Sequence, residues 1–189
     1  MTTKFVCHGG WIGSDTCIEE GRPWLRPAAA EYIESKLHEG DNVFEWGCGA
    51  STIWLARLGC YVTSVELDHD WVKRTRAWLE EEGLSENVRI IDFSPKNSAN
   101  LCESADFILK GLDNAYDLIL IDGRTRSRCL GNSRSKVKVG GMLVLDNSER
   151  EEYANGVALM DTWDGYEYGD LGWRTTVYFR LPESETERV

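Results

Sequence analysis

The chain has 189 residues, of which 42% are hydrophobic and 28% are charged, and its formal net charge is −11. This length and composition predict one globular domain that folds without disulfides. The acidic excess disfavours nonspecific binding to nucleic acid and to anionic membranes, so we expect a small-molecule partner.

The cysteines and the apolar segments exclude further classes of protein. Six cysteines are scattered without a CxxC pair or a histidine at ligand spacing, which disfavours a zinc site. The first residues, MTTKFVCHGGWIG, lack the basic start and apolar core of a secretion signal, and no stretch of about 18 apolar residues occurs. We therefore expect a cytoplasmic protein that is neither secreted nor inserted in a membrane.

Helical and strand patterns alternate along most of the chain. A first helix is expected within residues 23–40, which begin with a proline-containing turn and end at Gly40. The expected strands are residues 42–46, 61–66, 87–91, 116–121 and 141–145, and the expected helices between them are residues 50–58, 69–82, 101–112 and 124–138. This repetition predicts an α/β fold with a parallel sheet and helices on both faces.

The end of the chain departs from this repetition. Residues 149–160 have a helical pattern, but residues 164–170 and 173–180 follow each other too closely for a crossover helix. They should therefore pair as antiparallel strands. The expected divisions are an N-terminal extension or lid at residues 1–23, a single domain at residues 24–180 and a polar tail at residues 181–189.

A glycine turn follows the first expected strand, in the sequence FEWGCGAST. Gly47 and Gly49 would let the backbone approach a ligand at the carboxyl end of the strand. About 20 residues further on, Glu66 ends the second strand, where a carboxylate can accept hydrogen bonds from ribose hydroxyls. Thr52 replaces the third glycine of a dinucleotide fingerprint, and Glu45 suits a cationic sulfonium ligand better than a pyrophosphate. The pattern thus favours a ribose-containing cofactor other than NAD.

Four segments, VFEWGCGASTIWLA, VTSVELDHDW, YDLILIDG and GGMLVLDN, occur in this order. Together they resemble the class I S-adenosylmethionine-dependent methyltransferases over roughly residues 24–180. The resemblance implies a single-domain, Rossmann-like α/β fold whose seven-stranded, mostly parallel sheet has an antiparallel last strand. It also implies S-adenosylmethionine as the cofactor.

The resemblance assigns cofactor contacts residue by residue. The implied contacts are Glu45, Gly47, Gly49 and Ser51 around the methionine portion, Glu66 at the ribose, Asp92 or Phe93 beside the adenine, and Asp122 at the cofactor's edge. The alternatives are that Glu66 is only a solvated strand end and that Phe93 is a core residue.

Two aspartates, Asp122 and Asp146, end the fourth and fifth strands and should face the ligand crevice, so both are candidate catalytic residues. Resemblance to catechol-type O-methyltransferases implies that they bind magnesium together with Asn147. The metal ion would lower the pKa of the hydroxyl group that accepts the methyl group. Thr125 stands where those enzymes place their base lysine. The alternative is that Asp146 and Asn147 cap the segment that follows them.

Residues 123–145 contain six basic residues and no acidic residue. We hypothesise that Arg124, Arg126 or Arg128 grips a carboxylate or phosphate of the acceptor, and Arg124 is the catalytic candidate among them. The alternative is a solvated cationic face that balances nearby acidic helices.

The sequence therefore predicts a methyltransferase that acts on a small molecule, with oxygen as the preferred acceptor atom and an anionic group as the hypothesised contact of the arginines. Two alternatives stay open. One is a nucleotide-binding oxidoreductase on a related fold, and the other is a protein that binds the cofactor without catalysis.

Overall fold

The computed structural model describes residues 22–94 and 97–182. The expectations for residues 1–21 and 183–189 lie outside the described residues.

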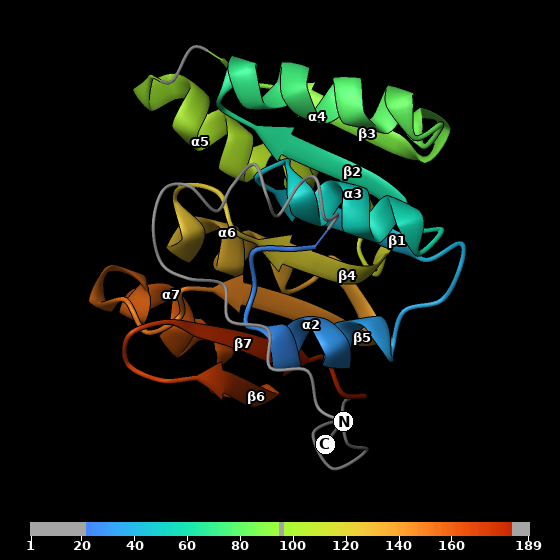
Figure 1. Cartoon of the computed structure of the whole chain (residues 1–189). Coiled ribbons are helices and arrows are strands. Elements are labelled where there is room, and N and C mark those ends of the chain that lie inside the picture. The colour runs from blue at the N-terminus through green and yellow to red at the C-terminus, as the bar shows by residue number, and fades with distance from the viewer. Residues whose placement is uncertain (1–21, 95–96, 183–189) are drawn as a thin grey trace.

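A seven-stranded sheet forms the centre of the molecule, with the strand order β3-β2-β1-β4-β5-β7-β6 (Figure 1). The strands are β1 (Asn42–Trp46), β2 (Tyr61–Glu66), β3 (Val88–Asp92), β4 (Tyr116–Ile121), β5 (Val137–Asp146), β6 (Asp164–Gly169) and β7 (Arg174–Phe179). Neighbours from β3 to β5 pair in parallel, whereas β7 pairs antiparallel with both β5 and β6. This topology confirms the expected sheet and its antiparallel last strand.

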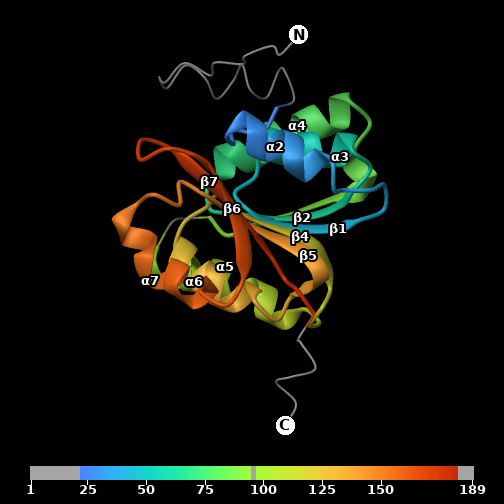
Figure 2. The same ribbon diagram turned by 90° about the horizontal axis from the view of Figure 1, so that it is seen from below.

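Helices cover both faces of the sheet, as predicted. Figures 1 and 2 show α2, α3 and α4 on one face and α5, α6 and α7 on the other. The α-helices are α2 (Pro27–Glu34), α3 (Ala50–Arg57), α4 (His69–Glu81), α5 (Ser98–Asp106), α6 (Arg126–Ser133) and α7 (Ala154–Val157), and the short 3-10 turns are η1 (Ser85–Asn87), η2 (Phe107–Lys110), η3 (Glu151–Tyr153) and η4 (Ala158–Met160).

The central strands are buried on both faces, and alternate residues supply two separate cores. One core receives residues such as Phe44, Trp46 and Ile121, and the opposite core receives Val43 and Leu118. Each fully buried side chain of this size stabilises the fold by roughly 1.5–3 kcal/mol relative to an exposed one. Because β2, β1, β4 and β5 are parallel neighbours, their carboxyl ends lie side by side at the same end of the sheet.

Several predicted boundaries were wrong. The first helix covers only Pro27–Glu34. The helix expected at residues 124–138 covers only Arg126–Ser133, and it begins at Arg126 because Thr125 has a left-handed backbone with φ of 54°. Part of that segment, from residue 137 onward, instead extends β5. The helix expected at residues 149–160 is instead divided into η3, α7 and η4, and Gly156, within α7, packs closely against Ser127.

No helix within the described ranges is long and apolar enough to cross a membrane.

Candidate functional site

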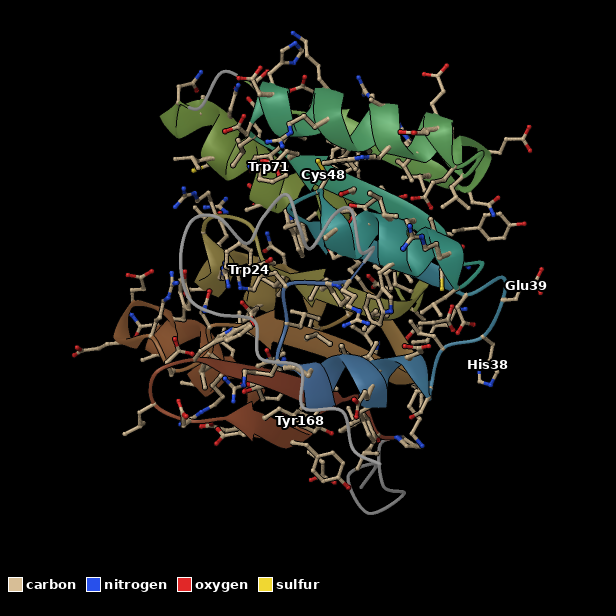
Figure 3. The ribbon with its side chains drawn as sticks, in the orientation of Figure 1. Trp24, His38, Glu39, Cys48, Trp71 and Tyr168 are labelled. Atoms are coloured by element: carbon tan, nitrogen blue, oxygen red, sulfur yellow. The ribbon has the colours of Figure 1, made fainter. Side chains whose placement is uncertain are left out.

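A cavity of about 480 Å³ opens at the carboxyl ends of the strands. Figure 3 shows Trp24, Cys48 and Trp71 toward this end of the sheet, whereas His38 and Glu39 lie at the opposite end. The lining includes the predicted residues Gly47, Gly49, Ser51, Glu66, Asp122, Arg124 and Arg126. The structure therefore brings seven of the sequence-predicted residues to one cavity.

The glycine turn borders the cavity and packs against the turn that follows β4. Gly47 has φ of +101°, a conformation that favours glycine, and an added Cβ would lie 3.3 Å from the backbone nitrogen of Gly123. A Cβ added to Gly49 would meet no atom within 4 Å. The backbone is thus close to Gly123 on one side and leaves open space on the other, as a bound cofactor would require.

Glu45 lies beneath the turn and is fully buried. Its carboxylate accepts hydrogen bonds from the hydroxyls of Ser51, Thr52 and Ser64, and the Thr52 hydroxyl also accepts the N–H of Gly49. Burial raises the pKa of Glu45 to about 7, although the three hydroxyls oppose the shift. In this structure Glu45 joins β1 and β2 to the start of α3, and it does not line the cavity.

Glu66 ends β2 with its carboxylate beside the cavity. Oε2 accepts the backbone N–H of Cys48 at 3.0 Å, and Oε1 accepts those of Leu67 at 2.6 Å and Asp68 at 2.8 Å. Burial raises the pKa of Glu66 against the effect of these three donors. Because a carboxylate offers about four acceptor positions, one remains for a ribose hydroxyl.

The predicted adenine contacts lie away from the cavity lining. Asp92 faces His69, with 2.6 Å between Oδ2 and Nδ1, and Phe93 is partly buried against the core, where it packs edge-to-face on Phe107. Trp71, in the first turn of α4, lines the cavity next to the end of β2. Trp71 also packs against a core cluster, and sequence reasoning did not identify its contact with the cavity, although its position five residues after Glu66 placed it near the carboxyl end of the strand.

Asp122 borders this cavity and a second one of about 340 Å³. Oδ1 accepts a hydrogen bond from Arg126 Nη2 at 2.8 Å, and no described residue donates to Oδ2. The side chain is 33% exposed. Burial raises the pKa of the Asp122 carboxyl. The charge of Arg126 opposes this shift, and the charge of Asp146 adds to it.

Asp146 is buried and accepts hydrogen bonds from two residues at the start of β7. Its Oδ1 accepts the Trp173 indole N–H at 3.0 Å and the Thr175 hydroxyl at 2.7 Å. Burial raises the pKa of this carboxyl against these hydrogen bonds. Neither Asp146 nor Asn147 is the N-cap of the following η3 turn; that position is Arg150, and its side chain makes no capping hydrogen bond.

Arg126 occupies the space between the three residues predicted to bind magnesium. Its guanidinium donates to Asp122 and to Asn147 Oδ1, and it lies 4.0 Å from Asp146 Oδ2. Among the residues that the structure describes, no group of three His, Cys, Asp or Glu side chains could hold a metal ion. Because the Arg126 guanidinium fills the space between Asp122, Asp146 and Asn147, the residues present do not fit the magnesium site implied by the resemblance to catechol-type enzymes.

The three candidate arginines have different surroundings. Arg128 forms an ion pair with Asp106 on the surface, and Arg126 is 7% exposed. Arg124 lines the first cavity, and its side chain has no hydrogen bond or ion pair with another described residue. Of the three, Arg124 is the one available to a ligand.

The second cavity adjoins the first through shared walls. Trp24, Asp122 and Arg150 border both cavities, and Trp173 contributes an aromatic wall to the second. Sequence reasoning missed Trp24, Arg150 and Trp173, because each reaches the site from a segment outside the strand-end motifs.

A seven-stranded sheet of this order, with a glycine turn after the first strand and an acidic residue ending the second, is the arrangement of the class I S-adenosylmethionine-dependent methyltransferases. The chain belongs to the methyltransferase domain family, whose model matches residues 44–148. Membership implies S-adenosylmethionine as the cofactor. No match was found among the curated proteins.

Solved structures show the same fold. A methyltransferase-like protein from Silicibacter pomeroyi is 21% identical, with a TM-score of 0.62 over 88% of this chain and 92% of that chain. An rRNA methylase from Streptococcus thermophilus is 14% identical, with a TM-score of 0.63 over 80% and 94%. An S-adenosylmethionine-dependent O-methyltransferase from Thermotoga maritima is 15% identical, with a TM-score of 0.55 over 84% and 67%. At these identities the likeness extends to the fold alone.

Proposed function

We propose that this methyltransferase transfers the methyl group of S-adenosylmethionine to a hydroxyl oxygen of a small anionic molecule. The observation that supports this most directly is the position of Asp122. It borders the cavity that contains Glu66 and the glycine turn, and it also borders the adjoining cavity. A carboxylate so placed can reach an acceptor held next to the cofactor.

The first cavity fits the cofactor. The free acceptor position of Glu66 suits a ribose hydroxyl, and the space beside Gly49 suits the methionine portion. We propose that the ring of Trp71 flanks the adenine, a role predicted for Asp92 or Phe93. The cofactor supplies a methyl group already activated on a sulfonium, so positioning and proton removal are the main tasks left to the protein.

Asp122 is the proposed general base. Oδ2 takes the proton of the acceptor hydroxyl as the oxygen forms its bond to the methyl carbon. The carbon–sulfur bond breaks at the same time, and sulfur keeps the electron pair. Asp146 is the weaker candidate for this role, because Trp173 and Thr175 already donate to its Oδ1.

The acceptor's charge is inferred from the cations at the cavity walls. Arg124 lacks a partner among the described residues, and Arg150 has only distant ion pairs of 4.0 Å with Glu149 and Glu152. Both line the first cavity, and a guanidinium can bind a carboxylate or phosphate with two hydrogen bonds. Trp24 and Trp173 would pack against the apolar part of the acceptor.

The test has two stages. Calorimetric titration with S-adenosylhomocysteine and, separately, with NAD should show binding of the first ligand only. Turnover of S-adenosylmethionine is then measured over hydroxylated carboxylates and phosphates, their neutral amide or ester analogues, and RNA. Turnover with the anionic compounds alone would support the proposal. Methylation of RNA or of the neutral analogues would contradict the acceptor class, and cofactor binding without any turnover would favour a non-catalytic protein.

A further inference from the structure

The guanidinium of Arg126 uses all five of its N–H groups on oxygen atoms of the protein. Nε donates to the carbonyl of Gly123 at 3.0 Å, and Nη2 donates to both the carbonyl and Oδ1 of Asp122 at 2.6 and 2.8 Å. Nη1 donates to the carbonyl of Asp146 and to Oδ1 of Asn147, the latter at 3.3 Å. An arginine has five such donors, so none remains for a substrate.

The surroundings hold this group in place. Arg126 is the first residue of α6, directly after the left-handed Thr125, and its side chain is 7% exposed. The ring of Tyr153 lies over one face of the guanidinium, with 5.4 Å between its central carbon and the ring centroid. Withdrawal of Arg126 would leave two carboxylates and four carbonyl or amide oxygens facing one another, which is electrostatically unfavourable.

We infer that the Arg126 guanidinium is a permanent positive charge beside the second cavity, where the methyl acceptor would bind. It takes the place that a divalent metal ion would have between Asp122, Asp146 and Asn147. The inference rests on the proposed function, since it assigns a role at the same site. A planar guanidinium directed at five oxygens is a permanent charge, whereas oxygen ligands of this kind would otherwise suit a hard cation.

Arg126 is thus a positioning residue that acts through Asp122. Nη2 binds Oδ1 and fixes the plane of the carboxylate, which leaves Oδ2 for the acceptor's proton. A metal bound at the same place would instead coordinate the acceptor oxygen. Deprotonation of the acceptor here therefore depends on the Asp122 carboxylate and not on coordination to a metal.

The experiment measures Mn²⁺ binding by electron paramagnetic resonance of the free ion, on wild-type protein and on Arg126→Ala. We expect no stoichiometric binding by the wild type and one bound ion per chain in Arg126→Ala, lost again when Asp122→Asn is added. Arg126→Lys, which keeps the charge, should not bind Mn²⁺. Arg128→Ala is the matched control, because it removes a surface guanidinium from the same helix.

Stoichiometric Mn²⁺ binding by the wild type that is lost in Asp122→Asn would overturn the inference, and this result does not depend on the folding of any Arg126 variant. Absence of binding by folded Arg126→Ala would also overturn it. Arg126→Gln replaces Arg126→Ala if circular dichroism shows that the alanine variant is unfolded. Binding of S-adenosylhomocysteine by the wild type is measured separately, so a failure of the cofactor assignment is distinguished from a failure of the Arg126 assignment.

Discussion

The backbone N–H of Cys48 donates to Oε2 of Glu66 at 3.0 Å, so the carboxylate that ends β2 also fastens the glycine turn that follows β1. One side chain thus shapes the turn and, under the proposed function, holds the ribose. Loss of Glu66 should affect cofactor affinity through both contacts.

Glu66→Ala is expected to weaken binding of S-adenosylhomocysteine by about 10- to 100-fold, because hydrogen bonds to a charged group contribute roughly 1.5–3 kcal/mol. Isothermal titration calorimetry measures the effect. Glu86→Ala, in the exposed η1 turn, is the control and should bind as the wild type does. Unchanged affinity in Glu66→Ala would rule out the ribose contact.

Gly49→Ala should abolish most cofactor binding, because its Cβ would enter the open space beside the turn. Gly83→Ala is a matched control: Gly83 also has positive φ and open space around its Cβ, but it follows α4 away from the cavity. Both variants should lose about 1–3 kcal/mol of stability from backbone strain. Thermal unfolding and calorimetry separate the two effects, and equal cofactor affinities in the two variants would contradict the placement.

Glu45→Gln should change how stability depends on pH. The folded-state pKa of Glu45 is raised to about 7 from the usual 4.5, so folding favours the protonated carboxyl. The corresponding stability is fully present below about pH 4.5 and is lost as pH rises through about 7. Relative to wild type, Glu45→Gln should therefore gain up to roughly 3 kcal/mol between pH 5 and pH 8. Urea unfolding at both pH values tests this, and a pH-independent difference would refute it.

Arg124→Ala should raise the KM for an anionic acceptor by about tenfold, since a charge-assisted contact of roughly 1.4 kcal/mol would be lost. Arg128→Ala should leave KM unchanged, because Arg128 is engaged with Asp106 on the surface. Steady-state kinetics with the acceptor identified by the turnover assay provides the comparison. Equal KM values for wild type and Arg124→Ala would remove Arg124 from the acceptor site.

The sheet could be predicted from the sequence because its signals are local. The buried part of β4, residues 118–121, is a continuous apolar run, and the acidic or glycine residues at the carboxyl ends of parallel strands must lie close together. The grouping of Gly47, Glu66 and Asp122 around one cavity follows from that rule.

The environment of Arg126 could not be predicted in this way. Its partners come from positions as far as 21 residues away, and its direction depends on the left-handed backbone of Thr125, which no periodicity indicates. The contact of Trp71 with the cavity was missed for a related reason. A tryptophan at helical spacing is usually a core residue, and only its distance from the end of β2 distinguishes it.

Hydrogen bonds beside the second cavity connect residues from distant parts of the chain. The backbone N–H of Arg26 donates to the hydroxyl of Thr175 at 3.1 Å, and that hydroxyl donates to Asp146. Because synthesis proceeds from the N-terminus, residues 42–121 emerge from the ribosome well before Thr175. A nascent chain can therefore assemble the strands around the glycine turn early, whereas Asp146 obtains its donors only when β7 has been made.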